Sequence, residues 1–129
     1  MAEYSNGRIE ITTVGERIYR LKPVEGIEMN VDDVRQAREI YLKLSAGQFF
    51  SVLLDATGSF TISDEARALI ASKEYSVQRK AAALVTPGLV NRLVGNFFIQ
   101  FNKPGSPTKL FNDEASALAW LEEQMNKHK

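Results

Sequence analysis

LLDATGSFTISDEARAL, residues 53–69, is the stretch of sequence that decides the fold. It starts in an apolar run that ends at Asp55, continues through a polar loop, and reaches Ser63 just before a helical pattern of apolar residues. This order predicts a buried strand, a loop at its carboxyl end and the start of a helix. In open α/β sheets ligands bind at such places, because the free N–H groups at a helix start attract anions.

The chain before this stretch predicts a hairpin and a helix. Residues 8–14 and residues 17–22 alternate between apolar and polar side chains around a turn signal at Gly15, which is typical of a β-hairpin. Asn30 followed three residues later by Asp33 resembles a capping box. We therefore expect a helix to begin after Asn30 and to lie on the sheet.

Three short apolar segments predict the remaining strands. Residues 49–54 are apolar except for Ser51, and residues 81–85 are wholly apolar, as expected for strands covered on both faces. Residues 108–111 predict a last strand, and Asn112 is expected to cap the final helix. The order β-β-α-β-α-β-α-β-α predicts one α/β domain over residues 1–129, a mixed sheet of about five strands in which a hairpin precedes parallel strands, with about four helices.

A wide apolar stripe marks the helix predicted between residues 87 and 101. The stripe is broader than one sheet face requires, so the helix is either buried on most sides or has a second apolar face for a partner. The second explanation favours a homodimer or a bound ligand at this helix. The residues that would form this interface or ligand site are Arg92, Asn96, Phe97, Phe101 and Lys103.

Composition excludes several classes of protein. The chain has 129 residues, 44% of them hydrophobic, and its 16 basic residues balance its 16 acidic ones, so no net charge favours nucleic acid or a membrane surface. It has no cysteine, which excludes disulfides and thiol chemistry and favours a reducing cytoplasm. No signal-peptide pattern is visible, and no apolar run approaches the roughly 20 residues that span a bilayer. We expect a cytoplasmic protein.

Charge is distributed unevenly along the chain. Residues 75–112 contain no acid and five basic residues, so this segment carries +5 and the remainder carries 0 − 5 = −5. The five bases are Arg79, Lys80, Arg92, Lys103 and Lys109. Two explanations remain open, namely chance combined with burial of an apolar segment, or a basic face for an acidic partner or an anionic ligand.

No catalytic or cofactor motif is present. The sequence has no GxSxG, no Walker lysine and no glycine fingerprint for dinucleotides, and its one histidine, His128, lies in a charged tail. Asp55 has no second carboxylate or histidine placed near it by the sequence, so we expect it to organise the loop rather than to act as a base. We expect no enzyme activity, no cofactor and no metal.

The whole pattern resembles the STAS domain of anti-sigma-factor antagonists, with its SpoIIAA-like fold. A closer resemblance, over nearly the whole chain, is to a group of small bacterial uncharacterised proteins called STAS-like. It rests on three segments of this sequence, which are LLDATG, AALVTPGLVNRLVGNFFIQFNKP and PTKLFNDEASALAWL.

This resemblance implies a regulatory module that recognises a protein partner through residues 55–67. In STAS domains a strand-ending aspartate, matched here by Asp55, precedes a helix start that carries a phosphorylated serine. The Asp-Ser-Ser-Gly of that region reads Ser63-Asp64-Glu65-Ala66 here, so the position of the phosphoserine falls on Asp64 or, with a slip of one residue, on Ser63. The predicted partner surface consists of Asp55, Thr57, Ser59, Ser63, Asp64 and Glu65.

Simpler roles compete with this function, and a second function is also open. Ser63 is more often a helix cap than a phosphorylation site, and Thr57 and Ser59 are of the kind that form local hydrogen bonds in turns. The second function is the binding of a small lipid-like or anionic amphiphile, because the layout is similar to the lipid-exchange domain of Sec14-type proteins. An enclosed apolar cavity of at least about 300 Å³ beside Phe97 or Phe101 would favour this second function.

Overall fold

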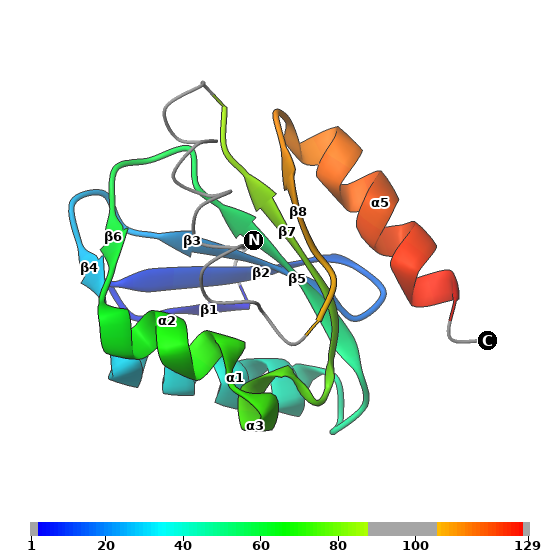
Figure 1. Cartoon of the computed structure of the whole chain (residues 1–129), viewed down its shortest axis with the longest axis horizontal. Coiled ribbons are helices and arrows are strands. Elements are labelled where there is room, and N and C mark those ends of the chain that lie inside the picture. Colours follow the sequence, from blue (N-terminus) through cyan, green and yellow to red (C-terminus); the bar gives the residue numbers. More distant parts are fainter. Residues whose placement is uncertain (1–2, 88–105, 128–129) are drawn as a thin grey trace.

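A six-stranded mixed sheet with helices on both faces forms the centre of the computed structural model, which describes residues 3–87 and 106–127 (Figure 1). The strands lie in the order β1-β2-β3-β5-β7-β8. The first three are antiparallel, and the pairs from β3 to β8 are parallel. Their bounds are β1 Tyr4–Ser5, β2 Ile9–Gly15, β3 Ile18–Pro23, β5 Phe50–Asp55, β7 Arg79–Val85 and β8 Thr108–Phe111.

Helices pack on opposite faces of this sheet (Figure 1). The bounds of the described helices are α1 Val31–Leu44, α2 Asp64–Ala71, α3 Lys73–Ser76 and α5 Glu114–Asn126. α1 and α2 cover the face that we call the α1 face, and α5 covers the opposite one. A parallel pair of two-residue strands, β4 Glu28–Met29 and β6 Thr61–Ile62, lies beside the α1 face.

The two central strands are neighbours, as the sequence predicts. Leu53 of β5 lies opposite Ala83 of β7, and Asp55 lies opposite Val85, so both carboxyl ends reach the same edge of the sheet. Alternate side chains of β5 enter separate cores, with Phe50 packed in the core under α1 and Leu53 in the core under α5. The prediction of strands buried on both faces is therefore confirmed.

Three details differ from the prediction. The main sheet has six strands, because the chain start adds β1 to the hairpin. β7 begins at Arg79, two residues before the apolar run. The last helix is capped by Asp113 and not by Asn112, since the Asp113 carboxylate accepts hydrogen bonds from the Ser116 N–H at 2.7 Å and the Ser116 hydroxyl at 3.1 Å. A carboxylate at a helix start also interacts favourably with the helix dipole.

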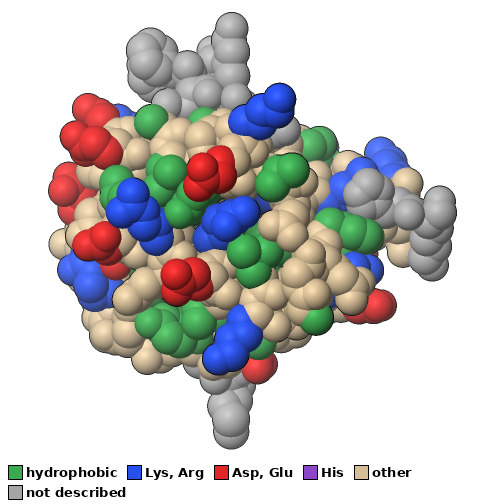
Figure 2. Space-filling view, turned by 90° about the horizontal axis from the view of Figure 1, so that it is seen from below, with side chains coloured by type: hydrophobic (Ala, Val, Ile, Leu, Met, Phe, Trp, Pro, Cys, Tyr) green, Lys and Arg blue, Asp and Glu red, His purple; other side chains and the backbone are tan. Residues whose placement is uncertain are grey.

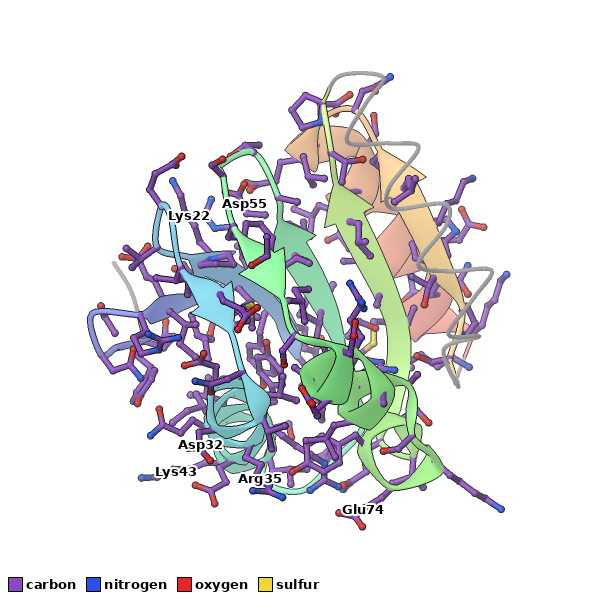
Figure 3. All side chains as sticks on the ribbon, turned by 60° about the vertical axis from the view of Figure 1, so that its left-hand side comes forward. Lys22, Asp32, Arg35, Lys43, Asp55 and Glu74 are labelled. Carbon is purple, nitrogen blue, oxygen red and sulfur yellow. The ribbon has the colours of Figure 1, made fainter. Side chains whose placement is uncertain are left out.

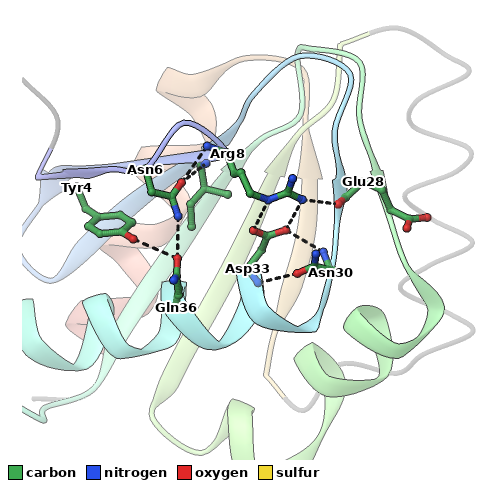
Figure 4. Close-up of polar contacts among 8 residues, drawn as sticks. Tyr4, Asn6, Arg8, Glu28, Asn30, Asp33 and Gln36 are labelled. Carbon is green, nitrogen blue, oxygen red and sulfur yellow. Dashed lines mark hydrogen bonds and ion pairs between the residues drawn. The ribbon is translucent and has the colours of Figure 1, made fainter.

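Polar contacts tie the start of the chain to α1 (Figure 4). The predicted capping box is present, because Asn30 Oδ1 accepts from the Asp33 N–H and Asp33 Oδ2 accepts from the Asn30 N–H. Arg8 donates from Nε and Nη2 to both oxygens of the buried Asp33, at 2.8 and 2.9 Å. The Arg8 pair and its hydrogen bonds hold the pKa of Asp33 below its usual range.

Three aromatic rings define one end of the core on the α1 face. Tyr41 of α1 stacks on Tyr19 of β3 with 5.8 Å between ring centroids, and its centroid lies 5.2 Å from that of Phe50. Such pairs add attraction beyond the apolar area that they bury. The stack therefore fixes the position of the Tyr41 hydroxyl against the amino ends of the central strands.

Candidate functional site

The predicted partner surface begins in a loop that the chain's own hydrogen bonds organise. Asp55 ends β5 at the carboxyl edge of the sheet, where Figure 3 labels it. Its Oδ1 accepts from the Thr57 N–H at 3.1 Å and from the Thr57 hydroxyl at 2.6 Å. The Ser59 N–H donates to Glu25 Oε1 at 3.0 Å. These contacts give Asp55 and Thr57 the local turn role that loop residues of this kind often have.

The start of α2 completes this surface. Ser63 is the N-cap residue, and its Oγ accepts from the Ala66 N–H at 3.1 Å. Asp64 forms an ion pair with Arg67, and its side chain remains 88% exposed. Glu65 is also exposed in the first turn. Asp55, Thr57 and Ser59 thus lie before β6, and Ser63, Asp64 and Glu65 lie after it at the start of α2. The hydroxyl of Ser63 is engaged in capping, and the two acids are open to solvent.

The predicted residues of the second group are not placed. Arg92, Asn96, Phe97, Phe101 and Lys103 lie outside the described residues, and so does most of the helix on which the expected homodimer rests. His128 lies outside them as well. Among the residues that the structure describes, no group of three or more histidine, aspartate or glutamate side chains is arranged to hold a metal ion.

A cavity of about 430 Å³ lies on the α1 face of the sheet. Its walls come from the central strands, from α1, and from the segment between Ala56 and Ile70, whereas the six residues of the predicted partner surface are not among its lining residues. Most of its lining is apolar. The apolar residues that line it are Leu21, Met29, Val34, Ala37, Phe50, Val52, Leu54, Ala56, Phe60, Ile62, Ile70, Ala82 and Leu84.

Two residues that line this cavity have a buried hydroxyl without a hydrogen-bond partner among the described residues. Tyr41 is only 7% exposed, and within the described parts of the chain its hydroxyl has no hydrogen-bond partner. The same holds for the Thr86 hydroxyl, which lines the cavity at the carboxyl end of β7. An unpartnered buried hydroxyl costs free energy that a bound polar group would recover.

Three arginines also line the cavity, and they differ in their partners. Arg67 pairs with Asp64. Arg38 donates to the Glu74 carbonyl at 3.3 Å, and its guanidinium lies 4.8 Å from the centroid of the Tyr75 ring. Arg79 donates only to neutral groups among the described residues. Its two hydrogen bonds go to Ser106 Oγ at 2.8 Å and to the Ile70 carbonyl at 3.0 Å.

Burial shifts the two titratable groups at the Phe50 end of the cavity in opposite directions. It raises the pKa of Tyr41, so the hydroxyl stays neutral and keeps its proton. It lowers the pKa of Arg79, although the guanidinium remains a cation at neutral pH. Each group also moves the pKa of the other through its charge. Both lie beside Phe50, which is the register partner of Arg79 and packs against the Tyr41 ring. The site thus offers a neutral donor beside a cation.

Sequence reasoning missed both of these residues. Tyr41 reads as an ordinary member of the apolar stripe of its helix, because a sequence pattern does not say where a hydroxyl lies. Arg79 did carry a signal, since it belongs to the acid-free segment 75–112. An anionic ligand was one of the two explanations for the charge of that segment, but the charge pattern did not indicate which of its five basic residues would bind it.

The exposed surface around α1, α2 and α3 carries both signs of charge. Seen from this side, Lys and Arg side chains are interspersed with Asp and Glu and with small apolar patches (Figure 2). Asp32 and Arg35 on α1 are an example, with 3.9 Å between Asp32 Oδ1 and Arg35 Nη1. None of the described helices is long and apolar enough to cross a membrane.

Comparison with known proteins gives a family and a fold. The model of the family "Domain of unknown function (DUF7793)" matches residues 12–125. Among solved structures, the chain is similar to an uncharacterized protein from the DUF3478 family with a SpoIIAA-like fold from Shewanella loihica PV-4. The TM-score is 0.63 and the sequence identity 22%, over 94% of this chain and 98% of that one. No curated protein matches the chain. The chain therefore has a SpoIIAA-like fold, as its resemblance to STAS domains implied.

Proposed function

The chain belongs to the family of unknown function DUF7793 and has a SpoIIAA-like fold, and from this premise we propose that it is a non-enzymatic binding module for a small, largely apolar molecule. The ligand lies in the cavity on the α1 face. This is the second of the two functions that the sequence left open, and the geometry favours it over the first.

The cavity is the single observation that carries this proposal. Its volume of about 430 Å³ lies within the range of roughly 300–1,000 Å³ that is usual for small-molecule sites. It also has their usual character, which is an apolar lining with a few polar groups that fix orientation. In contrast, the predicted partner surface consists of side chains whose hydrogen bonds already organise their own loop and helix.

The lining favours binding over catalysis. Among the described residues that line the cavity there is no histidine, cysteine, aspartate or glutamate, so the titratable groups are arginines and tyrosines. A general base at neutral pH needs a pKa near that value, which is not the ordinary range of either residue type. We therefore propose that the ligand is held and released without covalent chemistry.

A substitution that fills the cavity tests this function. Ala82 lines the cavity on β7, and Ala82→Leu would place three further carbon atoms into it. The matched control is Ala119→Leu, on an exposed position of α5 across the sheet. We expect the wild-type protein and A119L to bind the neutral fluorescent probe N-phenyl-1-naphthylamine at one saturable site. A82L should bind it roughly tenfold or more weakly, as steric changes in apolar pockets do. Unsaturable binding to the wild type, or equal affinity in A82L, would refute the function.

A second candidate function is recognition of a protein partner through the surface of residues 55–67. The observation that favours it is the exposed pair of acids Asp64 and Glu65 in the first turn of α2. A basic partner residue would gain from the charge of these acids, although each exposed pair of charges contributes little. Recognition of this kind would make the protein a regulatory module of the STAS type.

Charge reversal at one acid tests this candidate. Asp64 and Asp32 each lie in the first turn of a helix, each pairs with an arginine three residues later, and each has an 88% exposed side chain. Asp64→Lys is therefore matched by Asp32→Lys, whose outward position on α1 Figure 3 labels. The three proteins are used to capture partners from a lysate of the native host. A protein that the wild type and D32K retain and that D64K loses would support recognition through this surface. Identical sets of retained proteins in all three would count against it.

A further inference from the structure

Two polar residues of the cavity, Arg79 and Tyr41, lie at one end of it. Arg79 opens β7 and lies opposite Phe50, the first residue of β5. The Tyr41 ring packs against the Phe50 ring at 5.2 Å. The cavity therefore has a polar end at the amino ends of the central strands, and we call Arg79 and Tyr41 its head-group site.

Arg79 is a cation without a carboxylate. A guanidinium has five N–H donors, and the hydrogen bonds of Arg79 within the described residues go to Ser106 and Ile70. No ion pair forms between Arg79 and an acid of the described residues. Residues 1–2, 88–105 and 128–129 contain no Asp or Glu, so they supply no acidic side chain either. A partly buried charge of this kind favours an anion from outside the chain.

The Tyr41 hydroxyl adds a donor at the same place. It is buried, keeps its proton and, within residues 3–87 and 106–127, is without a hydrogen-bond partner. A cation beside a neutral O–H donor is a pair that one acidic oxygen group satisfies at once, with a charge-assisted hydrogen bond from each. This unpartnered hydroxyl is independent of the charge argument and leads to the same ligand.

The head-group site contains a single cation. Of the other two arginines that line the cavity, Arg67 is already paired with Asp64. Arg38 donates to the Glu74 carbonyl and to Gln78 Oε1, with its guanidinium against the Tyr75 ring, and is not part of the head-group site. One unbalanced cation favours a monoanion, such as a carboxylate, over a doubly charged phosphate.

We infer that Arg79 and the Tyr41 hydroxyl bind the carboxylate of an amphipathic monocarboxylic acid, whose hydrocarbon part fills the apolar remainder of the cavity. This inference rests on the proposed function and gives its ligand a chemical class. The hydrocarbon part runs along the central strands from Phe50 toward Ala56, past Leu54 and Leu84. Six residue steps at ~3.3 Å each make this path about 20 Å long, which is more than an extended ten-carbon chain needs.

Isothermal titration calorimetry on full-length, delipidated protein tests the inference with two probes that differ only in their head group. Decanoate carries the carboxylate, and decanol is its neutral counterpart. We expect the wild type to bind decanoate about tenfold or more tightly than decanol, because hydrogen bonds to a charged group are the strong ones. Tyr41→Phe should lower the affinity for decanoate about tenfold and leave that for decanol unchanged. Arg79→Gln should abolish the preference for decanoate, whereas Arg79→Lys should keep part of it.

The outcomes separate this inference from the function on which it rests. If decanol and decanoate bind equally well to the wild type, the head-group site is refuted while the binding function stands. If neither binds, the binding function fails as well. Tighter binding of decyl phosphate than of decanoate would overturn the assignment of a monoanion. If R79Q fails to fold, the affinity of Y41F for decanoate still tests the head-group site, because this variant keeps the aromatic ring and removes only the hydroxyl.

Discussion

Replacement of Tyr41 by phenylalanine should make the ligand-free protein more stable. The hydroxyl is buried and, among the described residues, unpartnered, so folding removes it from water without a replacement hydrogen bond. Such a group costs roughly 1–3 kcal/mol. Phenylalanine keeps the ring that packs on Tyr19 and Phe50. We take the lower end of the range, because the hydroxyl also makes van der Waals contacts that are lost.

The expected gain in the free energy of unfolding is therefore about 1 kcal/mol. For a chain of 129 residues this raises the Tm by about 4 °C. Urea and thermal denaturation of delipidated protein, followed by circular dichroism, measure both quantities. The same variant should bind a carboxylate more weakly, so stability and affinity should change in opposite directions. This combination distinguishes a ligand-binding hydroxyl from one that only supports the fold.

The control is the same substitution at Tyr4, where the hydroxyl does have a partner. Tyr4 Oη donates to Gln36 Oε1 at 3.1 Å near the surface (Figure 4). Tyr4→Phe should leave stability unchanged or lower it by about 0.5 kcal/mol. If Y41F lowers the free energy of unfolding by as much as Y4F or more, the Tyr41 hydroxyl has a stabilising partner in solution, and the reasoning about the head-group site is wrong.

Two further predictions concern the helix starts. Arg8→Met should destabilise the protein at pH 7, because it leaves the buried Asp33 carboxylate without its cation. The pKa of Asp33 is lowered in the folded state. The stabilisation by the ion pair is therefore present above the ordinary pKa of an aspartate and is lost as the pH falls through the lowered value. The urea midpoints of R8M and of the wild type should converge in acid. Ser63→Ala should cost about 1 kcal/mol through loss of the cap, whereas Ser63→Asp should retain most of the stability. Ser59→Ala, on the exposed loop, is the control; equal loss in S63A and S59A would contradict the capping role.

Local patterns were sufficient to predict most elements. The continuous apolar runs predicted β5 and β7 as neighbouring strands buried on both faces, because only such strands need apolar side chains at every position. The Asn30–Asp33 capping box predicted the start of α1, since its two hydrogen bonds join residues only three apart. The cap of α5 was misplaced by one residue, because Asn112 and Asp113 are both good caps and only the structure selects between them.

The amino-acid sequence by itself therefore determined the fold class, the order of its elements and the rim at which the central strands end. Only the tertiary structure decided which side chains meet. Tyr41 and Arg79 are 38 residues apart in the sequence (79 − 41 = 38), and they come together because α1 and β7 both pack against the start of β5. The periodicity of apolar residues in the sequence indicates which face of a helix or strand is apolar. It does not indicate a cavity or a hydroxyl without a partner, because both depend on how elements that are distant in the sequence pack together.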